Sequence, residues 1–422
     1  MQFEEEYIRL LQEELIPAMG CTEPIAIAFA AAKARELLEV FPENIVIKCS
    51  GNIIKNVQGV VVPNTGNLRG IEVAAIAGAL YGSSEKGLEV LRDIPNEKIV
   101  QIREKANSGL CTVYHLEDAD PLEIHIIVQA GKTQAEVRLR EKHTNIVYIS
   151  KNGQVLLEKN SPEQEANAGG TAYESLTMDG IFDFSKNVEI SRVKAILDRQ
   201  IEYNHKIAEE GLSNDYGAAI GKTIIENTEG SVENLARAYA AAGSDARMSG
   251  CEMPVVINCG SGNQGLTVSL PVLIYAESLK AENDKRYRAL LISNLTALHV
   301  KSVIGRLSAF CGVVSAASGA GAAITYLKGG DENEMKQAVS NTLAIASGMV
   351  CDGAKPSCAA KIAVAVEAAI ISSNMALKGR TFQAGEGLVK KDIERTILAF
   401  GNMARNGMQQ TDREILRIML EQ

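Results

Sequence analysis

Small residues dominate the C-terminal half of this chain, and their density constrains its fold more than any other feature. Segments with the apolar spacing of helices are crowded with alanine, glycine and serine near 283–310, 312–327, 333–349, 358–377 and 390–405. Small side chains let helix backbones approach closely, which suits a site where several helix ends converge. No repeat of about 20–50 residues is present, so a solenoid is excluded. The sequence therefore predicts a tightly packed helical domain.

Residues 41–187 have a different character. Runs rich in β-branched residues predict strands at 45–48, 122–128, 134–139, 146–150 and 155–159. Asn152-Gly153, between the last two runs, is typical of a type I′ hairpin turn. Helical patterns at 70–80 and 85–91 lie between the strands. An α+β domain is therefore expected in this part of the chain.

The whole chain is predicted to be α+β and mainly helical. Residues 1–40 have the pattern of two helices and are expected to pack on residues 188–422, forming one Ala/Gly-rich helical domain. The α+β domain, residues 41–187, would then be an insertion. This arrangement would bring the N-terminal segment within reach of distant parts of the chain.

Composition and charge exclude several classes of function. The net charge is −9 and no long basic run appears, so a nucleic-acid partner is not expected. The apolar stretch 359–377 contains Lys361 and Glu367, so it lacks the roughly 20 clean apolar residues of a membrane span. The acidic N-terminus lacks the pattern of a signal peptide. We expect a cytoplasmic protein whose 8 cysteines are reduced thiols or metal ligands.

Three cysteines in the C-terminal half are candidate metal ligands. Cys351 and Cys358 lie in Cys-Asp-Gly-Ala-Lys-Pro-Ser-Cys, and Cys311 lies in Phe-Cys-Gly-Val-Val-Ser. Three thiolates suit a [4Fe–4S] cluster that leaves one iron open as a Lewis acid. The Cys-x6-Cys spacing matches neither zinc motifs nor ferredoxin runs. Spacing alone leaves two alternatives, which are buried cysteines acting as small hydrophobes and a structural zinc in a non-catalytic or redox-sensing protein.

Another cysteine, Cys21, lies in Gly-Cys-Thr-Glu-Pro, where one helical pattern ends and another begins. Thr22 is a suitable N-cap, and Pro24 suits the first turn of the new helix. The dipole of a helix lowers the pKa of a thiol at its N-terminus, which favours the reactive thiolate. The simpler interpretation is a capping motif preceded by a buried cysteine.

The segment Gly-Ser-Gly-Asn-Gln-Gly at 260–265 has donors that could hold a carboxylate. Backbone N–H groups in glycine-rich turns bind anions, and Ser261, Asn263 and Gln264 add polar side chains. The letters also fit G-x-G-x-x-G, but the segments that follow have helical patterns and do not suit a βαβ unit. Arg306 could bind a carboxylate through two hydrogen bonds, although a surface ion pair is the commoner role. An ordinary loop is the alternative for 260–265.

Taken together, these segments resemble one family. Met-Gly-Cys-Thr-Glu-Pro-Ile-Ala at 19–26 looks like the N-terminal signature of iron–sulfur L-cysteine desulfidases, which are similar to the α-chain of iron–sulfur L-serine dehydratases. The match continues, in order, through Ser-Gly-Asn-Ile-Ile-Lys-Asn at 50–56, Val-Pro-Asn-Thr-Gly at 62–66, Asn-Cys-Gly-Ser-Gly-Asn-Gln-Gly at 258–265, Ile-Gly-Arg-Leu-Ser-Ala-Phe-Cys-Gly at 304–312 and the segment 351–358. Jointly, these blocks are more specific than any one of them.

The resemblance implies elimination of sulfide from L-cysteine, giving pyruvate and ammonia. Cys311, Cys351 and Cys358 would be ligands of a [4Fe–4S] cluster in the helical catalytic domain. Cys21 would be catalytic, as a base or a transient iron ligand. The short gap between Cys351 and Cys358 favours the desulfidase branch over the L-serine dehydratase alternative.

These expectations also cover partners. The resemblance implies L-cysteine as the small-molecule partner, with no nucleic acid and no membrane, and a homo-oligomer is left open. A pyridoxal phosphate lyase is the last alternative for such a reaction, because no segment marks a lysine as a Schiff-base site.

Overall fold

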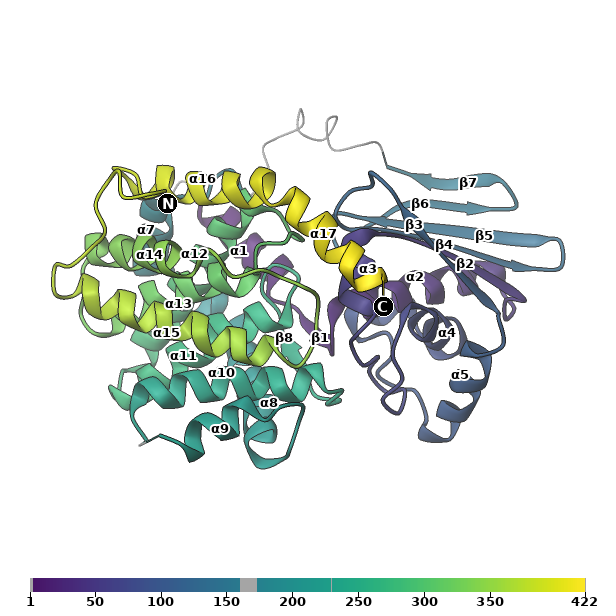
Figure 1. The fold of residues 1–422 in the computed structure, drawn as a ribbon, viewed down its shortest axis with the longest axis horizontal. Helices are drawn as coiled ribbons and strands as arrows, with labels where there is room; N and C mark the ends of the chain where they lie inside the picture. Colours follow the sequence, from purple (N-terminus) through teal and green to yellow (C-terminus); the bar gives the residue numbers. More distant parts are fainter. Residues whose placement is uncertain (1–2, 160–172, 229, 422) are drawn as a thin grey trace.

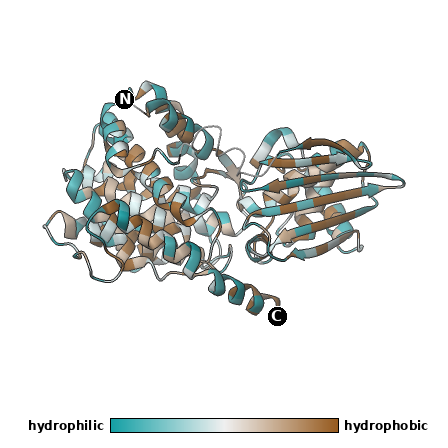
Figure 2. Ribbon diagram, turned by 90° about the horizontal axis from the view of Figure 1, so that it is seen from above, coloured by the Kyte–Doolittle hydropathy of each residue, from teal (hydrophilic) through white to brown (hydrophobic). Residues whose placement is uncertain are grey.

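The computed structural model describes residues 3–159, 173–228 and 230–421, and these form two lobes (Figure 1). One lobe is helical and holds most of the C-terminal half, whereas the other is built on a six-stranded sheet. Hydrophobic residues gather inside the helical lobe and alternate with hydrophilic residues along the strands (Figure 2). The predicted fold class, α+β and mainly helical, is confirmed.

The sheet lobe is formed mainly by residues that follow the first two helices. Its elements are β2 (Asn44–Ser50), α3 (Gly51–Val57), α4 (Ile71–Tyr81), the 3-10 turns η1 (Ser84–Glu89) and η2 (Asn96–Lys98), α5 (Ile99–Ala106), β3 (Cys111–Leu116), β4 (Glu123–Ala130), β5 (Thr133–Arg140), β6 (Ile146–Lys151) and β7 (Gln154–Glu158). The strand order is β3-β2-β4-β5-β6-β7. β2 and β3 are parallel, and the other neighbouring strands are antiparallel.

One face of this sheet is apolar and is covered by a helix. Alternate residues such as Ile45, Ile47 and Val137 are fully buried, as the two-residue period of a strand requires. α2 (Thr22–Leu38) contacts β4 and β5 on this face and packs on α4. A Cβ at Gly78 of α4 would lie 2.1 Å from the carbonyl oxygen of Ala28 in α2, so glycine permits the close approach.

The helical lobe surrounds one central helix. Its elements are α1 (Glu4–Glu14), β1 (Pro17–Met19), α7 (Met178–Asn187), α8 (Ser191–Ser213), α9 (Ile220–Glu226), α10 (Val232–Met248), β8 (Pro254–Val256), α11 (Gly262–Ser278), α12 (Asn283–Ile304), α13 (Gly312–Leu327), α14 (Glu332–Ala346), α15 (Cys358–Ala376), α16 (Ile393–Asn402) and the π-turn η4 (Met403–Gly407). α13 contacts α11, α12, α14 and α15. At Gly319 of α13, a Cβ would lie 2.2 Å from the carbonyl oxygen of Ser293 in α12. The small residues therefore let α13 sit at the centre of this lobe.

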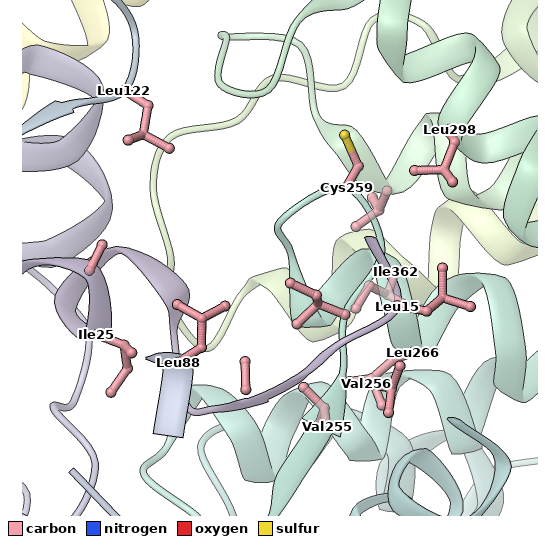
Figure 3. Close-up of a cluster of buried hydrophobic side chains, with 14 of the residues drawn as sticks. Leu15, Ile25, Leu88, Leu122, Val255, Val256, Cys259, Leu266, Leu298 and Ile362 are labelled. Carbon is pink, nitrogen blue, oxygen red and sulfur yellow. The ribbon is translucent and has the colours of Figure 1, made fainter. Parts of the chain in front are cut away.

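A short antiparallel sheet ties the N-terminal segment to the helical lobe. β1 pairs with β8, and α1 contacts α8 and α12. The chain then crosses into the sheet lobe, where α2 begins. Leu15 and Val255 lie on one side of this crossing and Ile25 and Leu88 on the other (Figure 3), and all four belong to one continuous apolar core.

Two helices pack differently from the expected domain division. α2 was expected on the helical domain with the rest of residues 1–40, but it covers the apolar face of the sheet. α7 was expected within the insertion, residues 41–187, but it contacts α12 and α14 and buries Ile181 and Phe184. The packing of these two helices differs from the expected one because the pattern of a short apolar helix does not indicate which lobe the helix covers. The division into 1–40, 41–187 and 188–422 stays a prediction.

The last helix, α17 (Gln409–Leu420), extends from the helical lobe and contacts α3 of the sheet lobe (Figure 1). Within the described ranges, α15 is the one helix long and apolar enough to cross a membrane by length and composition. It packs against α10, α13 and α14, and a buried core helix meets the same criteria.

Candidate functional site

One cavity at the junction of the lobes gathers every candidate site residue from the sequence analysis. Its lining includes Cys21, Ser261, Asn263, Gln264, Arg306, Cys311, Cys351 and Cys358. The cavity volume is about 90 Å³, below the range of about 300–1,000 Å³ that is usual for drug-sized ligands, so the cavity suits only a small molecule. Cys21 and Cys358 lie more than 300 positions apart in the sequence and meet only through the tertiary fold, so this convergence is a property of the packed lobes.

Four helices begin at this cavity. Cys21 is the N-cap of α2, Ser261 is the N-cap of α11, Cys311 is the N-cap of α13, and Cys358 is the first residue of α15. The N-terminus of a helix has unpaired N–H groups and the positive end of the helix dipole. The cavity is therefore suited to bind anions such as thiolates and carboxylates.

A backbone bridge brings two of the candidate metal ligands together. Phe310 and Val350, the neighbours of Cys311 and Cys351, form an isolated antiparallel β-bridge. The amide of Cys351 donates a hydrogen bond to the carbonyl oxygen of Ala309 at 2.6 Å. This bridge holds the start of α13 beside the loop that follows α14.

The third candidate ligand, Cys358, lies at the start of α15 with its thiol 3.6 Å from the carbonyl oxygen of Gly353. Burial raises the pKa of Cys358, and burial together with Cys351 raises the pKa of Cys311 to about 12. Without a metal these two thiols are protonated, so binding of a metal must release protons. Lys361, one turn along α15, pairs with Asp352 beside these thiols.

Three thiols on one cavity wall are the soft donors that an iron–sulfur cluster requires. Among the described residues, no group of three or more His, Cys, Asp or Glu side chains could hold one metal ion. Three buried polar atoms on the cavity wall, His143 Nε2, Arg247 Nε and Gln264 Oε1, have no hydrogen-bond partner in the described part of the chain. Such atoms indicate that the cavity binds a further group.

Cys21 lies at a helix N-terminus as predicted, but its expected low pKa is wrong. Its thiol is buried and donates a hydrogen bond to Glu23 Oε2 at 2.8 Å. Burial and the Glu23 carboxylate raise its pKa well above the ordinary value, which outweighs the helix dipole. Thr22 is the first helical residue and not the N-cap, and its hydroxyl donates to the carbonyl oxygen of Gly260 at 2.8 Å.

Glu23 joins Cys21 to the sheet lobe. Its Oε1 accepts a hydrogen bond from Asn56 Nδ2 at 3.2 Å and lies 3.7 Å from His143 Nε2. Burial opposes the charge of Glu23, but His143 and Cys21 outweigh it and lower the pKa of this carboxyl to about 2. His143 follows β5 and is itself buried. The site therefore contains a buried carboxylate beside an imidazole.

The cations around the cavity fall into two classes. Arg306 pairs with the buried Glu14, so its charge is already neutralised and the predicted two-point contact with a substrate carboxylate has a competitor. Arg247 and Lys301 are only 3% and 2% exposed, and neither forms an ion pair with any described residue. A buried cation without a counter-ion is costly, so these two side chains are the strongest anion-binding candidates here.

The glycine-rich segment forms a turn that leads into α11. Ser261 Oγ accepts a hydrogen bond from the amide of Gln264 at 3.4 Å, as an N-cap does. Asn263 Oδ1 accepts a hydrogen bond from Arg247 at 3.0 Å. Cys259 and Gly260 both have positive φ, which turns the chain so that the N-terminus of α11 faces the cavity.

Sequence reasoning missed four residues of this site. Glu23 lies inside a recognised motif but looks like a capping residue, and His143 looks like a solitary histidine near a strand. Arg247 and Lys301 lie in helical segments without a motif. One sequence signal could have indicated Lys301, because it is a charged residue within a largely apolar segment. Many surface lysines share this pattern, so the signal is not specific.

The chain is similar to known proteins over most of its length. The family model described as serine dehydratase alpha chain matches residues 85–417. A UPF0597 protein of Lachnoclostridium phytofermentans is 50% identical, with 98% of this chain and 99% of the relative covered. UPF0597 proteins of Finegoldia magna and Treponema denticola are 47% and 44% identical, with at least 98% of this chain and of each relative covered. The chain therefore belongs to the serine dehydratase alpha chain family, a family of lyase-type enzymes.

Proposed function

We propose that this protein is an iron–sulfur L-cysteine desulfidase, which eliminates sulfide from L-cysteine to give pyruvate and ammonia. The single observation that supports this most is that Cys311, Cys351, Cys358 and Cys21 line one cavity together with the buried side chains of Arg247 and Lys301. Family membership supports a lyase reaction on a small amino acid. The preference for L-cysteine rests on the chemistry of the site.

In this proposal Cys311, Cys351 and Cys358 hold a [4Fe–4S] cluster. The bound cluster supplies a Lewis-acidic iron with an open position for the leaving group of the substrate. Lys361 and the N-termini of α13 and α15 offset the negative charge of the three thiolates.

Arg247 and Asn263 bind the α-carboxylate of the substrate. Arg247 Nε has no partner in the described part of the chain, and Asn263 holds the same guanidinium at 3.0 Å. The N-terminus of α11 adds backbone N–H donors next to Asn263. Arg306 is paired with Glu14, so in this proposal it lines the wall of the cavity and does not bind the substrate.

His143 accepts the Cα proton in this mechanism. Its ring lines the cavity, and Glu23, 3.7 Å from Nε2, stabilises the positive charge that the imidazole gains. Cys21 keeps Glu23 in place through the hydrogen bond at 2.8 Å. As a buried neutral thiol it is the proton donor for the departing sulfur and not the expected thiolate base.

The bonds and charges of the elimination balance. The Cα–H bond breaks, its proton passes to His143, and its electron pair forms the Cα–Cβ double bond. The Cβ–S bond breaks with its electron pair, and the sulfur leaves as sulfide. Water then hydrolyses the resulting aminoacrylate, through its imine form, to pyruvate and ammonia.

L-Serine is the second candidate substrate, and the family description favours it. Loss of its hydroxyl would use the same residues, because the carboxylate and the Cα proton are common to both amino acids. The difference lies at Cβ, where a thiolate is a softer iron ligand and a better leaving group than a hydroxyl.

Iron content and activity measured together test the assigned ligands. The protein purified without oxygen should be brown and absorb broadly from violet to blue. Alanine at Cys311, Cys351 or Cys358 should remove iron and pyruvate formation together, whereas Cys111→Ala, outside the cavity, should keep both. Full activity in an iron-free variant, or a zinc-bound colourless wild type, would overturn the proposal.

A further inference from the structure

Lys55, in α3 of the sheet lobe, is one of the largest fully buried side chains in the protein, with 1% of its surface exposed. A buried ammonium group is costly unless charged or polar partners surround it. The partners of Lys55 therefore indicate the role of this side chain.

One partner comes from the last helix of the chain. Lys55 Nζ lies 2.5 Å from Asp412 Oδ1 of α17, and Asn52, on the same helix as Lys55, donates to Asp412 Oδ2 at 2.6 Å. α17 has no buried residue. Its principal packing partners are α3 and η4. The pair between Asp412 and Lys55 therefore attaches α17 to the sheet lobe, together with Leu416, which packs against the core, and Arg413, which pairs with Asp118.

The other partner of Lys55 lies on the loop of the candidate metal ligands. Lys55 Nζ donates a hydrogen bond to the carbonyl oxygen of Cys351 at 3.2 Å. Two residues on, Gly353 has φ +96°, and a Cβ there would lie 2.4 Å from the carbonyl oxygen of Lys55. The ligand loop is therefore packed directly on α3, and Lys55 joins it to α17.

We propose that α17 is a latch that positions Cys351 through Lys55. Asp412 holds the ammonium group in place, and the ammonium group holds the Cys351 carbonyl. When the ion pair between Asp412 and Lys55 breaks, the loop at Cys351 can move away from α13 and α15. This inference rests on the proposed function in one respect, because it takes Cys351 as a cluster ligand.

The latch explains why a charged pair is buried between an exposed helix and the ligand loop. A buried ion pair adds little net stability compared with apolar packing, but it sets one orientation for the groups it joins. Lys55 and Asp412 are positioning residues, since neither lines the cavity itself.

The first test measures how fast the cluster is lost. Wild type, Asp412→Asn and Asp412→Glu are purified without oxygen, and the visible absorbance is followed after addition of an iron chelator. Glu414→Gln is the control, because Glu414 is an exposed residue of the same helix that pairs with Arg417. Asp412→Asn should start with the wild-type iron content but lose its cluster about tenfold faster, a change of roughly 1.4 kcal/mol in the barrier. Asp412→Glu should recover part of the slow rate.

The second test needs no cluster, so it separates this inference from the proposed function. In metal-free protein, alkylation of Cys351 by a thiol reagent is followed by mass spectrometry, with the half-buried Cys111 as internal reference. Asp412→Asn should raise the rate at Cys351 several-fold and leave Cys111 unchanged. Equal rates in Asp412→Asn and Glu414→Gln, in both experiments, would overturn the latch.

Discussion

The thiol of Cys21 donates a hydrogen bond to the carboxylate of Glu23, with sulfur and oxygen 2.8 Å apart, at the point where α2 begins. A helix N-terminus alone would favour the thiolate, but a neighbouring carboxylate and full burial both favour the neutral thiol. Glu23 in turn contacts His143 of the other wall. Proton transfer in this site therefore involves the three residues together.

Cys21→Ser should keep most of the iron and lose most of the turnover. Serine can still donate a hydrogen bond to Glu23, so the wall of the cavity should stay intact, but its proton is far less acidic than that of a thiol. Loss of a positioned proton donor costs about 10²–10⁴ in rate. Iron content and kcat are the readouts, with Cys111→Ser as the matched control. Wild-type turnover would rule out an essential thiol, and loss of iron would make Cys21 a ligand.

His143→Gln should lower kcat by about 10²–10⁴ while KM and iron content change little, because the side chain receives a proton but does not hold the carboxylate. His115→Gln is the control, since His115 is exposed and lies outside the cavity. The loss of hydrogen–deuterium exchange at Cα, measured with substrate in D₂O, checks the role directly. Unchanged exchange with reduced elimination would place His143 at a later step.

Arg247→Met should raise KM for the amino acid and change kcat less. Removing one partner of a buried charged contact typically costs about 2–5 kcal/mol, which corresponds to at least a thirty-fold rise in KM, about 2 kcal/mol. Arg247→Lys should recover part of the affinity. The measurement is the separate effect on KM and kcat, and an unchanged KM would remove Arg247 from the substrate site.

Arg306→Met provides the contrast for Arg247. Because Arg306 pairs with Glu14, which is 2% exposed, its removal leaves a buried carboxylate with only the more distant Lys142, 3.8 Å away, as a counter-ion. The expected result is a loss of stability of about 3–5 kcal/mol, seen in denaturant unfolding, with a smaller effect on KM. A selective rise in KM at full stability would restore Arg306 as the carboxylate ligand.

Much of the local structure follows from the sequence because the patterns are local. The segment 312–327 was predicted as a helix and forms α13 with the same bounds. Asn152 and Gly153 both have positive φ, as the predicted type I′ turn between β6 and β7 requires. β3 was missed because its exposed residues, such as Tyr114, do not alternate clearly with apolar ones.

The site was less predictable because its geometry is tertiary. The sequence indicated Cys311, Cys351 and Cys358 through their motifs, and these residues do line one cavity. His143 was not singled out, because only the docking of the sheet lobe brings it to Glu23 of α2. The pKa of Cys21 could not be predicted either, since the helix dipole is visible in the sequence but burial is not.

Asp245 gives a pH test of the fold that is independent of catalysis. It lies in α10 and is fully buried, and its Oδ2 accepts a hydrogen bond from the amide of Gly221 at 2.9 Å. Burial raises the pKa of this carboxyl to about 6 from an ordinary value of 3.8. Between these values the folded protein binds the proton more tightly than the unfolded chain, so stability falls as pH rises, by roughly 3 kcal/mol.

Asp245→Asn should remove this pH-dependent contribution to the free energy of unfolding, because an amide does not ionise. The free energy of unfolding, measured in denaturant at pH 4.5, 5.5 and 7, should therefore increase in the variant relative to wild type as pH rises. Subtracting the free energy of unfolding of wild type from that of the variant at each pH cancels the contributions of all other titrating groups. A difference that stays constant across this range would show that Asp245 has an ordinary pKa.

The most direct test of the central claim is the anaerobic release of pyruvate and sulfide from L-cysteine, run beside pyruvate release from L-serine with the same iron-loaded protein. The account predicts equal amounts of pyruvate and sulfide from L-cysteine, a higher kcat/KM than for L-serine, and neither product from Cys358→Ala. A tenfold preference for L-serine would mean about 1.4 kcal/mol of transition-state stabilisation in the other direction. That result, or sulfide release by the iron-free variant, would contradict the assignment as a desulfidase.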